Sequence, residues 1–430
     1  MPLNFAIVEA YVAEYHQMMQ DKTLLRHDRY RILEALREKM RTPLRDYEVF
    51  EAELSSMLES IGRAKTYKDL QKHHLRSTAG IRNYFLEEQT IPDVHDLFRI
   101  VRDSITMRVL ELVEQEMEKE GFGRPPVGYC WIGLGSEGRD EQTFVTDQDN
   151  MIIYEDGDDD PAGQPLRQKY EEHTGKEGRK KGEIKAPDLL AFYFQQFAAR
   201  AVERLDGVGF ARCKGDIMPS NEKWRGSVRD WSTRIQDSLV NAKENLELLD
   251  IIILQDARLI RGPEGLFTAF ADAMRHHLRE NRQVMQELAR TAVVMPIALG
   301  FFGKFKVEST GEQKGKFNIK LFGWAPLIMS VRALAQQEGL QETNTLKRLR
   351  RLRDMNLVKR ETEVELIDAY LLFVRHRIDN QLNSADQAGV NFVDPEKLPA
   401  DEAAKIRKAM RTVEAFQKYI NEILLFGQPM

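Results

Sequence analysis

The chain has 430 residues, of which 42% are hydrophobic and 30% are charged, and its net charge is −5. This composition is that of a globular protein with two or three domains, and it argues against a chain that coats nucleic acid non-specifically. The two cysteines, Cys130 and Cys213, form no zinc-binding spacing and lie in apolar stretches, so we expect buried free thiols in a reducing compartment.

No segment of the sequence is expected to enter a membrane. The first residues lack the basic region of a secretory leader. The longest apolar run, 291–302, is too short to span a bilayer and contains Pro296 and Gly300. We therefore expect a soluble, cytoplasmic protein without a membrane partner.

Residues 1–118 are predicted to form an N-terminal helical region. Runs such as "YRILEALREKM" and "YEVFEAELSSMLESI" place apolar residues at three- and four-residue steps. A longer helix is indicated after Thr90, with Pro92 near its start and Gly121 after its end.

The pattern changes after residue 118. "VGYCWIGLG" is a short apolar run between Pro126 and Gly135, which is typical of a buried strand. Residues 149–155 and 207–214 are predicted as a second and a third strand, and an amphipathic helix beginning near Pro187 lies between them. This order predicts a small α/β or α+β sheet.

Residues 156–187 show no sustained periodicity and combine an acidic cluster with the basic run "GRKKGEIK", so we expect mainly a mobile insertion. Helices dominate again from residue 221, one of the clearest being "LFTAFADAMRHHLRENRQVMQELARTAVVM". We assign 119–288 to the sheet-containing domain and 289–430 to a C-terminal helical domain. One helical face of that domain is predicted to carry Leu346, Leu349, Leu352 and Met355.

Asp147 and Asp149 are the first residues whose spacing suggests a chemical function. Side chains two residues apart project to the same face of a strand, and the apolar "MIIY" that follows supports a strand here. Two adjacent unpaired carboxylates repel each other, whereas Mg²⁺ accepts carboxylate oxygens and completes its coordination with water and phosphate. The pair therefore indicates a magnesium site.

Gly135 and Ser136 follow the first strand. A glycine permits a tight turn, and backbone amides in such a turn can bind phosphate. The Ser136 hydroxyl is a further donor, Gly138 keeps the turn open, and Arg139 is suited to bidentate phosphate contact. A strand, a Gly-Ser pair, about ten residues and an Asp-x-Asp pair leading into an apolar strand together favour nucleotidyl transfer.

The stretch "GLGSEGRDEQTFVTDQDN" resembles the signature of the DUF294-type nucleotidyltransferase family, relatives of protein-PII uridylyltransferase within the DNA polymerase β-like superfamily. The resemblance continues through "CKGDIMPSNEKWRGSVRDW" and the C-terminal helical domain, and covers roughly residues 95–385. It implies an α+β fold in which a small mixed β-sheet domain is flanked by N-terminal and C-terminal helical domains, the latter binding substrate.

The same resemblance implies residue roles. Gly135 and Ser136 would hold the triphosphate of an NTP, and Asp147 and Asp149 would bind Mg²⁺. A third carboxylate commonly completes such sites and can act as a base. We take Asp216, just after the third strand, as the first choice for this third catalytic carboxylate.

Asp256, in "LQDARLIRG", is the alternative third carboxylate, and a buried ion pair with a nearby arginine is the competing interpretation for it. Lys320 and Arg332 lie in the matched C-terminal domain and would contact nucleotide or form internal ion pairs. The basic segment 347–360 is a solvated face or a phosphate-binding surface. Supporting roles, in orienting the carboxylates or capping the turn, are expected for Glu141, Gln142, Thr146, Gln148 and Asn150.

Three functions remain open at this level. The first is a Mg²⁺-dependent nucleotidyltransferase that moves NMP from an NTP to a hydroxyl of a protein side chain, a small molecule or a nucleic-acid end, uridylyltransferase-like and regulatory. The second is a non-catalytic, nucleotide-sensing signalling protein, which absence of a third carboxylate would favour. The third is a helical scaffold with a vestigial motif.

Overall fold

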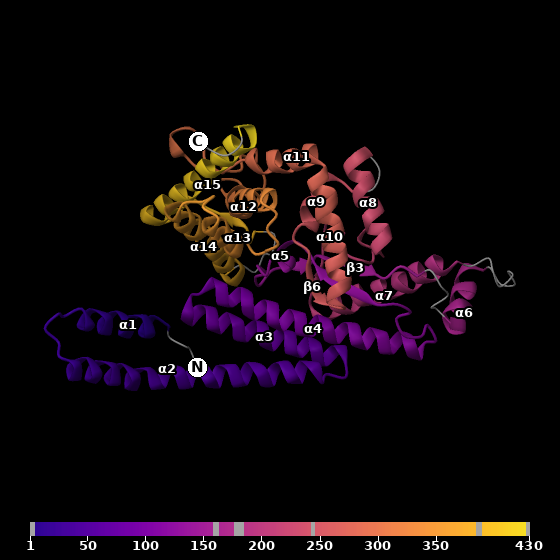
Figure 1. Cartoon of the computed structure of the whole chain (residues 1–430), viewed down its shortest axis with the longest axis horizontal. Coiled ribbons are helices and arrows are strands. Elements are labelled where there is room, and N and C mark those ends of the chain that lie inside the picture. The colour runs from indigo at the N-terminus through magenta and orange to yellow at the C-terminus, as the bar shows by residue number, and fades with distance from the viewer. Residues whose placement is uncertain (1–4, 158–162, 176–184, 242–245, 384–388, 427–430) are drawn as a thin grey trace. The chain divides into compact units, whose positions relative to one another are not determined.

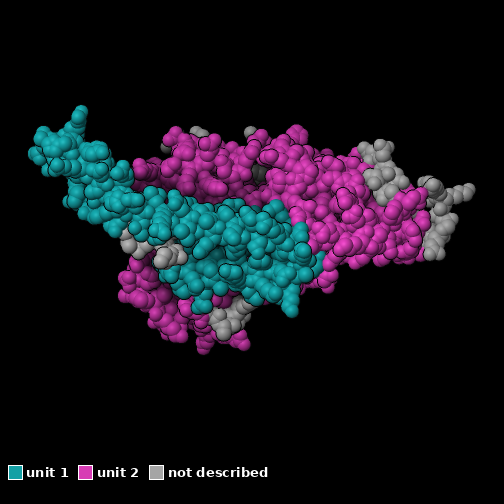
Figure 2. All heavy atoms as spheres, turned by 90° about the horizontal axis from the view of Figure 1, so that it is seen from below, with its two compact units in different colours: residues 1–109 teal, residues 110–430 magenta. Residues whose placement is uncertain are grey.

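The computed structural model describes residues 5–157, 163–175, 185–241, 246–383 and 389–426 (Figure 1). The chain divides into two compact units, residues 1–109 and 110–430 (Figure 2). The division falls within helix α4 (Ile91–Lys119). Among the described helices, none is both long enough and apolar enough to cross a membrane.

The first unit is helical, as the sequence predicts. It contains α1 (Phe5–Met19), α2 (Arg26–Gly62), α3 (Tyr67–Glu88) and the first two-thirds of α4. The Thr66 side chain caps α3 by accepting a hydrogen bond from the Asp69 backbone amide at 3.2 Å. Arg108 Nε donates to the Ala64 carbonyl at 2.8 Å, which ties α4 to the connection before α3.

The second unit is built on a four-stranded mixed sheet in the order β5-β3-β1-β6. Strand β1 pairs antiparallel with β3 and with β6, whereas β3 and β5 are parallel. Every residue of β1 and β3 is buried, which explains why these strands read as continuous apolar runs. The α+β class with a small mixed sheet is confirmed. The strands are β1 (Tyr129–Gly133), β3 (Asn150–Tyr154), β5 (Arg225–Ser227) and β6 (Arg258–Arg261).

The predicted third strand, 207–214, is largely wrong. Residues 207 and 208 end helix α7 (Ala186–Val208), and Gly209, at φ 118°, terminates that helix. Only β4 (Ala211–Arg212) is extended, and it pairs in parallel with β2 (Asp147–Gln148) outside the main sheet. This small pairing brings the chain after α7 beside Asp147.

Helices cover both faces of the sheet. On one face, α7 places Phe194 against Tyr154, with stacked rings whose centroids are 4.3 Å apart. On the other face, α8 (Val228–Asn241), α9 (Leu248–Leu254) and α10 (Glu264–Glu280) form a hydrophobic core with the alternate strand residues. Trp231 lies fully buried in that core, and its indole Nε1 donates to the Ile152 carbonyl at 3.2 Å.

Two regions differ from the sequence prediction. The expected single helix from Leu266 is two helices, α10 and α11 (Arg282–Val293), because Asn281 leaves helical geometry and donates through Nδ2 to the Leu239 carbonyl. The expected insertion contains α6 (Gly163–Thr174), which packs on α7 through Tyr170 and Phe192. Residues 158–162 and 176–184 of that insertion lie outside the described residues.

The C-terminal region is helical, as predicted. Helix α15 packs against α11, α12 and α14. Strands β7 and β8 form a two-stranded antiparallel pair. The predicted apolar face of α13 is confirmed at Leu346, Leu349 and Leu352, whereas Met355 follows the helix and is 40% exposed. The elements are β7 (Phe317–Asn318), the π-turn η3 (Lys320–Trp324), α12 (Ala325–Gln337), α13 (Thr345–Asp354), α14 (Arg360–Asn383), β8 (Phe392–Val393) and α15 (Ala400–Phe426).

Candidate active site

Asp147 and Asp149 lie side by side, as the strand periodicity predicts. Asp147 opens β2, and Asp149 occupies the one-residue break before β3. One carboxylate oxygen of each, together with Cys213 Sγ, lie within 4.8 Å of one another. In the described part of the chain, this is the one group of three or more acidic, cysteine or histidine side chains with a spacing that suits a metal ion.

Asp216, the expected third carboxylate, does not join this group. Its backbone has φ 54°, and its exposed carboxylate accepts a hydrogen bond from Asn221 Nδ2 at 3.0 Å. The turn at 213–216 presents Cys213 to the pair instead. The sequence prediction did not include this residue, because an apolar context is the usual signature of a structural thiol. Cys213 directly follows β4, the segment that pairs with β2.

Electrostatics distinguish the members of the group. Burial, followed by repulsion from Asp147, raises the pKa of Asp149 to about 6. Burial and the neighbouring Asp149 raise the pKa of the Cys213 thiol to about 12, so the thiol is protonated near neutral pH and hydrogen-bonds to Asp149. Two carboxylates that repel each other, with a neutral thiol beside them, form a site that a divalent cation would stabilise.

The Gly135–Ser136 turn lies directly against Asp149. It opens α5 (Gly135–Gly138), a single helical turn that follows β1. Gly135 has φ 53°, and a Cβ there would lie 2.8 Å from Asp149 Oδ2, so only glycine allows this approach. Ser136 is partly exposed, and its hydroxyl lies 3.4 Å from that of Thr146. The turn and the carboxylate pair therefore form one continuous site.

Gly138 and Arg139, both expected at phosphate, are buried. A Cβ on Gly138 would lie 1.8 Å from the Asp256 carbonyl oxygen, so this glycine is needed for backbone packing. Arg139 is 5% exposed, and its guanidinium pairs with Glu141 at 2.8 Å and with Asp256 at 2.5 Å. The Arg139 guanidinium is paired through Nε and Nη1, and Gly138 is required by backbone packing. These contacts favour a structural role for both residues.

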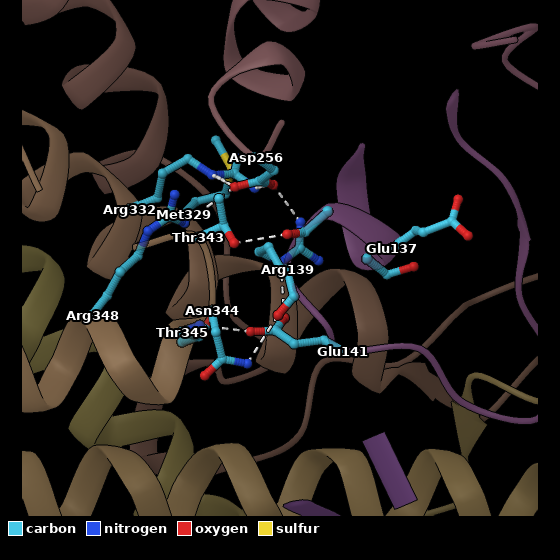
Figure 3. Close-up of polar contacts among 12 residues, drawn as sticks. Glu137, Arg139, Glu141, Asp256, Met329, Arg332, Thr343, Asn344, Thr345 and Arg348 are labelled. Atoms are coloured by element: carbon cyan, nitrogen blue, oxygen red, sulfur yellow. Dashed lines mark hydrogen bonds and ion pairs between the residues drawn. The ribbon is translucent and has the colours of Figure 1, made fainter. Parts of the chain in front are cut away.

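Asp256 is the centre of a buried ion-pair cluster (Figure 3). Its fully buried carboxylate contacts the guanidinium groups of Arg139, Arg332 and Arg348. Burial alone would raise the pKa of Asp256, but the three arginines hold it below its ordinary value. The buried ion-pair interpretation of Asp256 therefore fits, and Arg332 is its partner rather than a group open to nucleotide.

The C-terminal region contacts the turn directly as well. Thr343 Oγ1 donates to the Gly138 carbonyl at 2.7 Å, and Asn344 Nδ2 donates to the Arg139 carbonyl at 2.9 Å. The Thr345 amide donates to Glu141 Oε1 at 2.7 Å (Figure 3). Three successive residues thus fix the segment that follows Ser136.

Two further polar residues of the motif, Gln148 and Asn150, hydrogen-bond to neighbouring elements. Gln148 Nε2 donates to the Phe210 carbonyl at 2.7 Å, which holds the end of α7 beside β2. Asn150 Nδ2 donates to the buried carboxylate of Glu137. Gln148 and Asn150 flank Asp149, so these contacts hold the backbone on both sides of it.

Two cations lie on the C-terminal side of the site. The Lys320 side chain keeps an exposed surface, and Lys320 makes no ion pair with a described residue. Partial burial of its ammonium and the nearby Arg377 lower the pKa of Lys320, while Asp147 and Asp149 oppose that shift. Arg377 is buried with its guanidinium 4.4 Å from the centre of the Trp324 ring, and its Nη1 has no hydrogen-bond partner in the described structure. This side of the site therefore carries positive charge.

We predict that Asp256→Asn destabilises the protein by about 3–5 kcal/mol, because three buried arginines lose their charged partner. Urea unfolding measures this loss. The control is Asp272→Asn, which breaks an exposed pair with Arg275 and should change stability by less than about 0.5 kcal/mol. Equal stability of the Asp256 variant and the wild type would contradict the role given to this carboxylate.

We predict that Asp149→Asn stabilises the metal-free protein at pH 8. Between about pH 4 and 6 the folded protein keeps the Asp149 proton that the unfolded chain has released. The contribution of Asp149 to the free energy of unfolding therefore falls as the pH rises to about 6. Asparagine removes that penalty, which is worth roughly 1–3 kcal/mol. Urea unfolding in EDTA at pH 8 and pH 4.5 should show the gain only at pH 8, and Asp216→Asn should show none. A loss at pH 8 would mean that the Asp149 carboxylate is well paired.

Two family models match the chain. The one described as "Putative nucleotidyltransferase DUF294" matches residues 76–176 and 182–245, and the one described as "Putative nucleotidyltransferase substrate binding domain" matches residues 282–423. No curated protein matches the chain. The two models together cover most of its length, and the chain belongs to the DUF294 family.

Proposed function

We propose that this protein is a Mg²⁺-dependent nucleotidyltransferase that transfers NMP from an NTP to a hydroxyl group. One observation carries the proposal: Asp147 and Asp149 lie together against the Gly135–Ser136 turn. Metal-binding carboxylates and phosphate-binding amides are the two parts that such chemistry needs, since it depends mainly on positioning and charge neutralisation.

The donor set suits Mg²⁺. Asp147 and Asp149 offer hard carboxylate oxygens, whereas the protonated Cys213 thiol is a poor ligand for this ion and would remain a hydrogen-bond partner of Asp149. A bound Mg²⁺ would neutralise the developing charge on the phosphates. Burial, followed by repulsion from Asp147, raises the pKa of Asp149, and such a cation would offset both effects.

The chain's own groups would hold the triphosphate. Amides in the first turn of a helix have no acceptor within the helix, so the turn at Gly135 and Ser136 can donate to phosphate, and the Ser136 hydroxyl adds another donor. The Lys320 ammonium interacts electrostatically with Asp147 and Asp149, and it would balance the remaining negative charge of the triphosphate. The acceptor oxygen would bond to the α-phosphorus as the bond to pyrophosphate breaks, with release of the hydroxyl proton.

The acceptor is proposed by analogy alone. The resemblance to the uridylyltransferase group favours a protein side chain and a regulatory role in the cytoplasm, ahead of a small molecule or a nucleic-acid end. The chain's net charge of −5 supports placing nucleic acid last.

A second function is favoured by one observation. No third carboxylate joins Asp147 and Asp149 within the described residues, and a protonated thiol occupies that position. A site without a third carboxylate could bind Mg²⁺-NTP for signalling without turnover. Calorimetry together with the labelling assay separates the two, because a sensor binds Mg²⁺-NTP tightly but labels no acceptor in a cell extract.

We predict that Asp147→Asn and Asp149→Asn each lower nucleotidyl transfer at least about a hundredfold, because each removes a proposed metal ligand. The assay incubates the protein with α-labelled NTPs, Mg²⁺ and cell extract. Asp216→Asn is the matched control and should retain transfer, since that carboxylate lies outside the group. Equal labelling by wild type and both variants would refute the assignment.

We predict that Lys320→Gln weakens Mg²⁺-NTP binding by about tenfold, because a charge-assisted contact to phosphate is lost. Calorimetry measures the Kd, and the effect should shrink at high salt. The control Lys314→Gln removes an exposed lysine of the preceding loop. An unchanged Kd in the Lys320 variant would place this lysine outside the triphosphate site.

A further inference from the structure

A cavity of about 600 Å³ lies beside the Asp256 cluster, with Arg348 of that cluster in its wall. Its walls come from α9 and α10 of the sheet-containing region and from α11, α12 and the 339–343 loop of the C-terminal region. The volume lies in the range of small-molecule binding sites. None of the residues proposed to bind Mg²⁺ or triphosphate lines it.

The lining is apolar with cationic and amide groups. Phe267, Met274 and Leu340 are among its apolar residues, and three arginines and five glutamines supply the polar surface. No aspartate or glutamate is found among the described residues that line it. A cavity with this composition attracts an anion that carries an apolar body.

Gln255 indicates that a polar partner is missing. This residue is 9% exposed, and neither its amide oxygen nor its amide nitrogen has a hydrogen-bond partner in the described structure. Gln336 Nε2, on the facing helix α12, is also buried without a partner. Buried amide groups of this kind cost free energy unless a ligand or water satisfies them, and both residues line the cavity.

Arg279 provides a positive charge that no described residue neutralises. Arg348 is paired with Asp256, and Arg275 with Asp272, whereas Arg279 makes no ion pair with any described residue. Its Nη2 lies 2.5 Å from where a Cβ on Gly339 would be, so the glycine, at φ 71°, leaves room for the guanidinium at the cavity wall. An anionic head group beside Arg279 would gain a partner without breaking an existing ion pair.

We propose that this cavity is a second ligand site, and that it takes a small organic anion whose carboxylate or phosphate head faces Arg279 and whose apolar body lies among the α10 and α12 side chains. Polar atoms of the ligand beside that body hydrogen-bond to Gln255 and Gln336. Binding here does not depend on the nucleotidyl transfer proposed above.

Two residues that line the cavity also contact the turn at 135–139 or the Asp256 cluster that holds it. Thr343 lines the cavity and donates to the Gly138 carbonyl, and Arg348 lines it and contacts Asp256, which in turn holds Arg139. A ligand that moves either residue moves the segment after Ser136. Given the proposed function, this makes the ligand a regulator of transfer.

The test uses the full-length protein in EDTA without NTP, so that its result is independent of catalysis. The probe is 1-anilinonaphthalene-8-sulfonate, an apolar body with a sulfonate, and its uncharged analogue N-phenyl-1-naphthylamine is the control ligand. We expect one sulfonate probe bound per chain, and at least about tenfold weaker binding of the neutral analogue.

Variants locate the site. Ala271→Trp fills the cavity and Arg279→Gln removes the charge, and each should weaken binding of the sulfonate probe at least about tenfold. Ala269→Trp, exposed on the same helix, and Arg350→Gln, exposed on α13, are the matched controls and should bind normally. Gln255→Leu should keep or raise Tm, because the amide it removes has no partner.

Displacement by adenosine monophosphate would assign a phosphate head, and displacement by indole-3-acetate a carboxylate head; either supports the proposal. Absence of probe binding, equal binding of the neutral analogue, or unchanged binding in both Ala271→Trp and Arg279→Gln would overturn it. A strong fall in Tm for Gln255→Leu would also contradict it, because the amide would then be a structural partner.

Discussion

The buried carboxylate of Asp256 holds the two halves of the second unit together. Arg139 reaches it from the Gly-Ser turn, and Arg332 and Arg348 reach it from helices α12 and α13. One anion among three guanidinium groups is stable only if all of them stay in place, since an uncompensated buried charge costs several kcal/mol. The relative position of the turn and the C-terminal helices is therefore strongly constrained.

The candidate active site depends on that constraint. The turn and Asp149 come from the strands of the sheet, whereas Lys320 and Arg377 come from the C-terminal region. Thr343, Asn344 and Thr345 contact the backbone or side chains of residues 138–141 and so reinforce the same junction. The acidic pair and the cations thus face one site from two regions, which is the arrangement that a nucleotide with its divalent cation requires.

The sequence predicts most of what is local. Two buried strands, the turn between them and the paired projection of Asp147 and Asp149 follow from hydrophobic runs and from the two-residue period of a strand. Features that depend on tertiary contacts do not follow from local sequence patterns. Asp216 is adjacent to the right segment, but a left-handed backbone turns it to solvent and leaves Cys213 beside the pair. Arg139 has the chemistry of a phosphate ligand, yet Asp256, 117 residues later, takes its guanidinium into the core. No local pattern in the sequence encodes such a distant partner.

In the proposed function, Asp147 and Asp149 hold a divalent cation against a triphosphate on the Gly135–Ser136 turn. A crystal structure with Mn²⁺ and a non-hydrolysable NTP analogue tests it most directly, because the anomalous signal of Mn²⁺ locates the ion. We expect the ion between the two carboxylates and the phosphates at the amides of Gly135 and Ser136. A fully occupied analogue bound elsewhere, with no Mn²⁺ at either aspartate, would contradict the account.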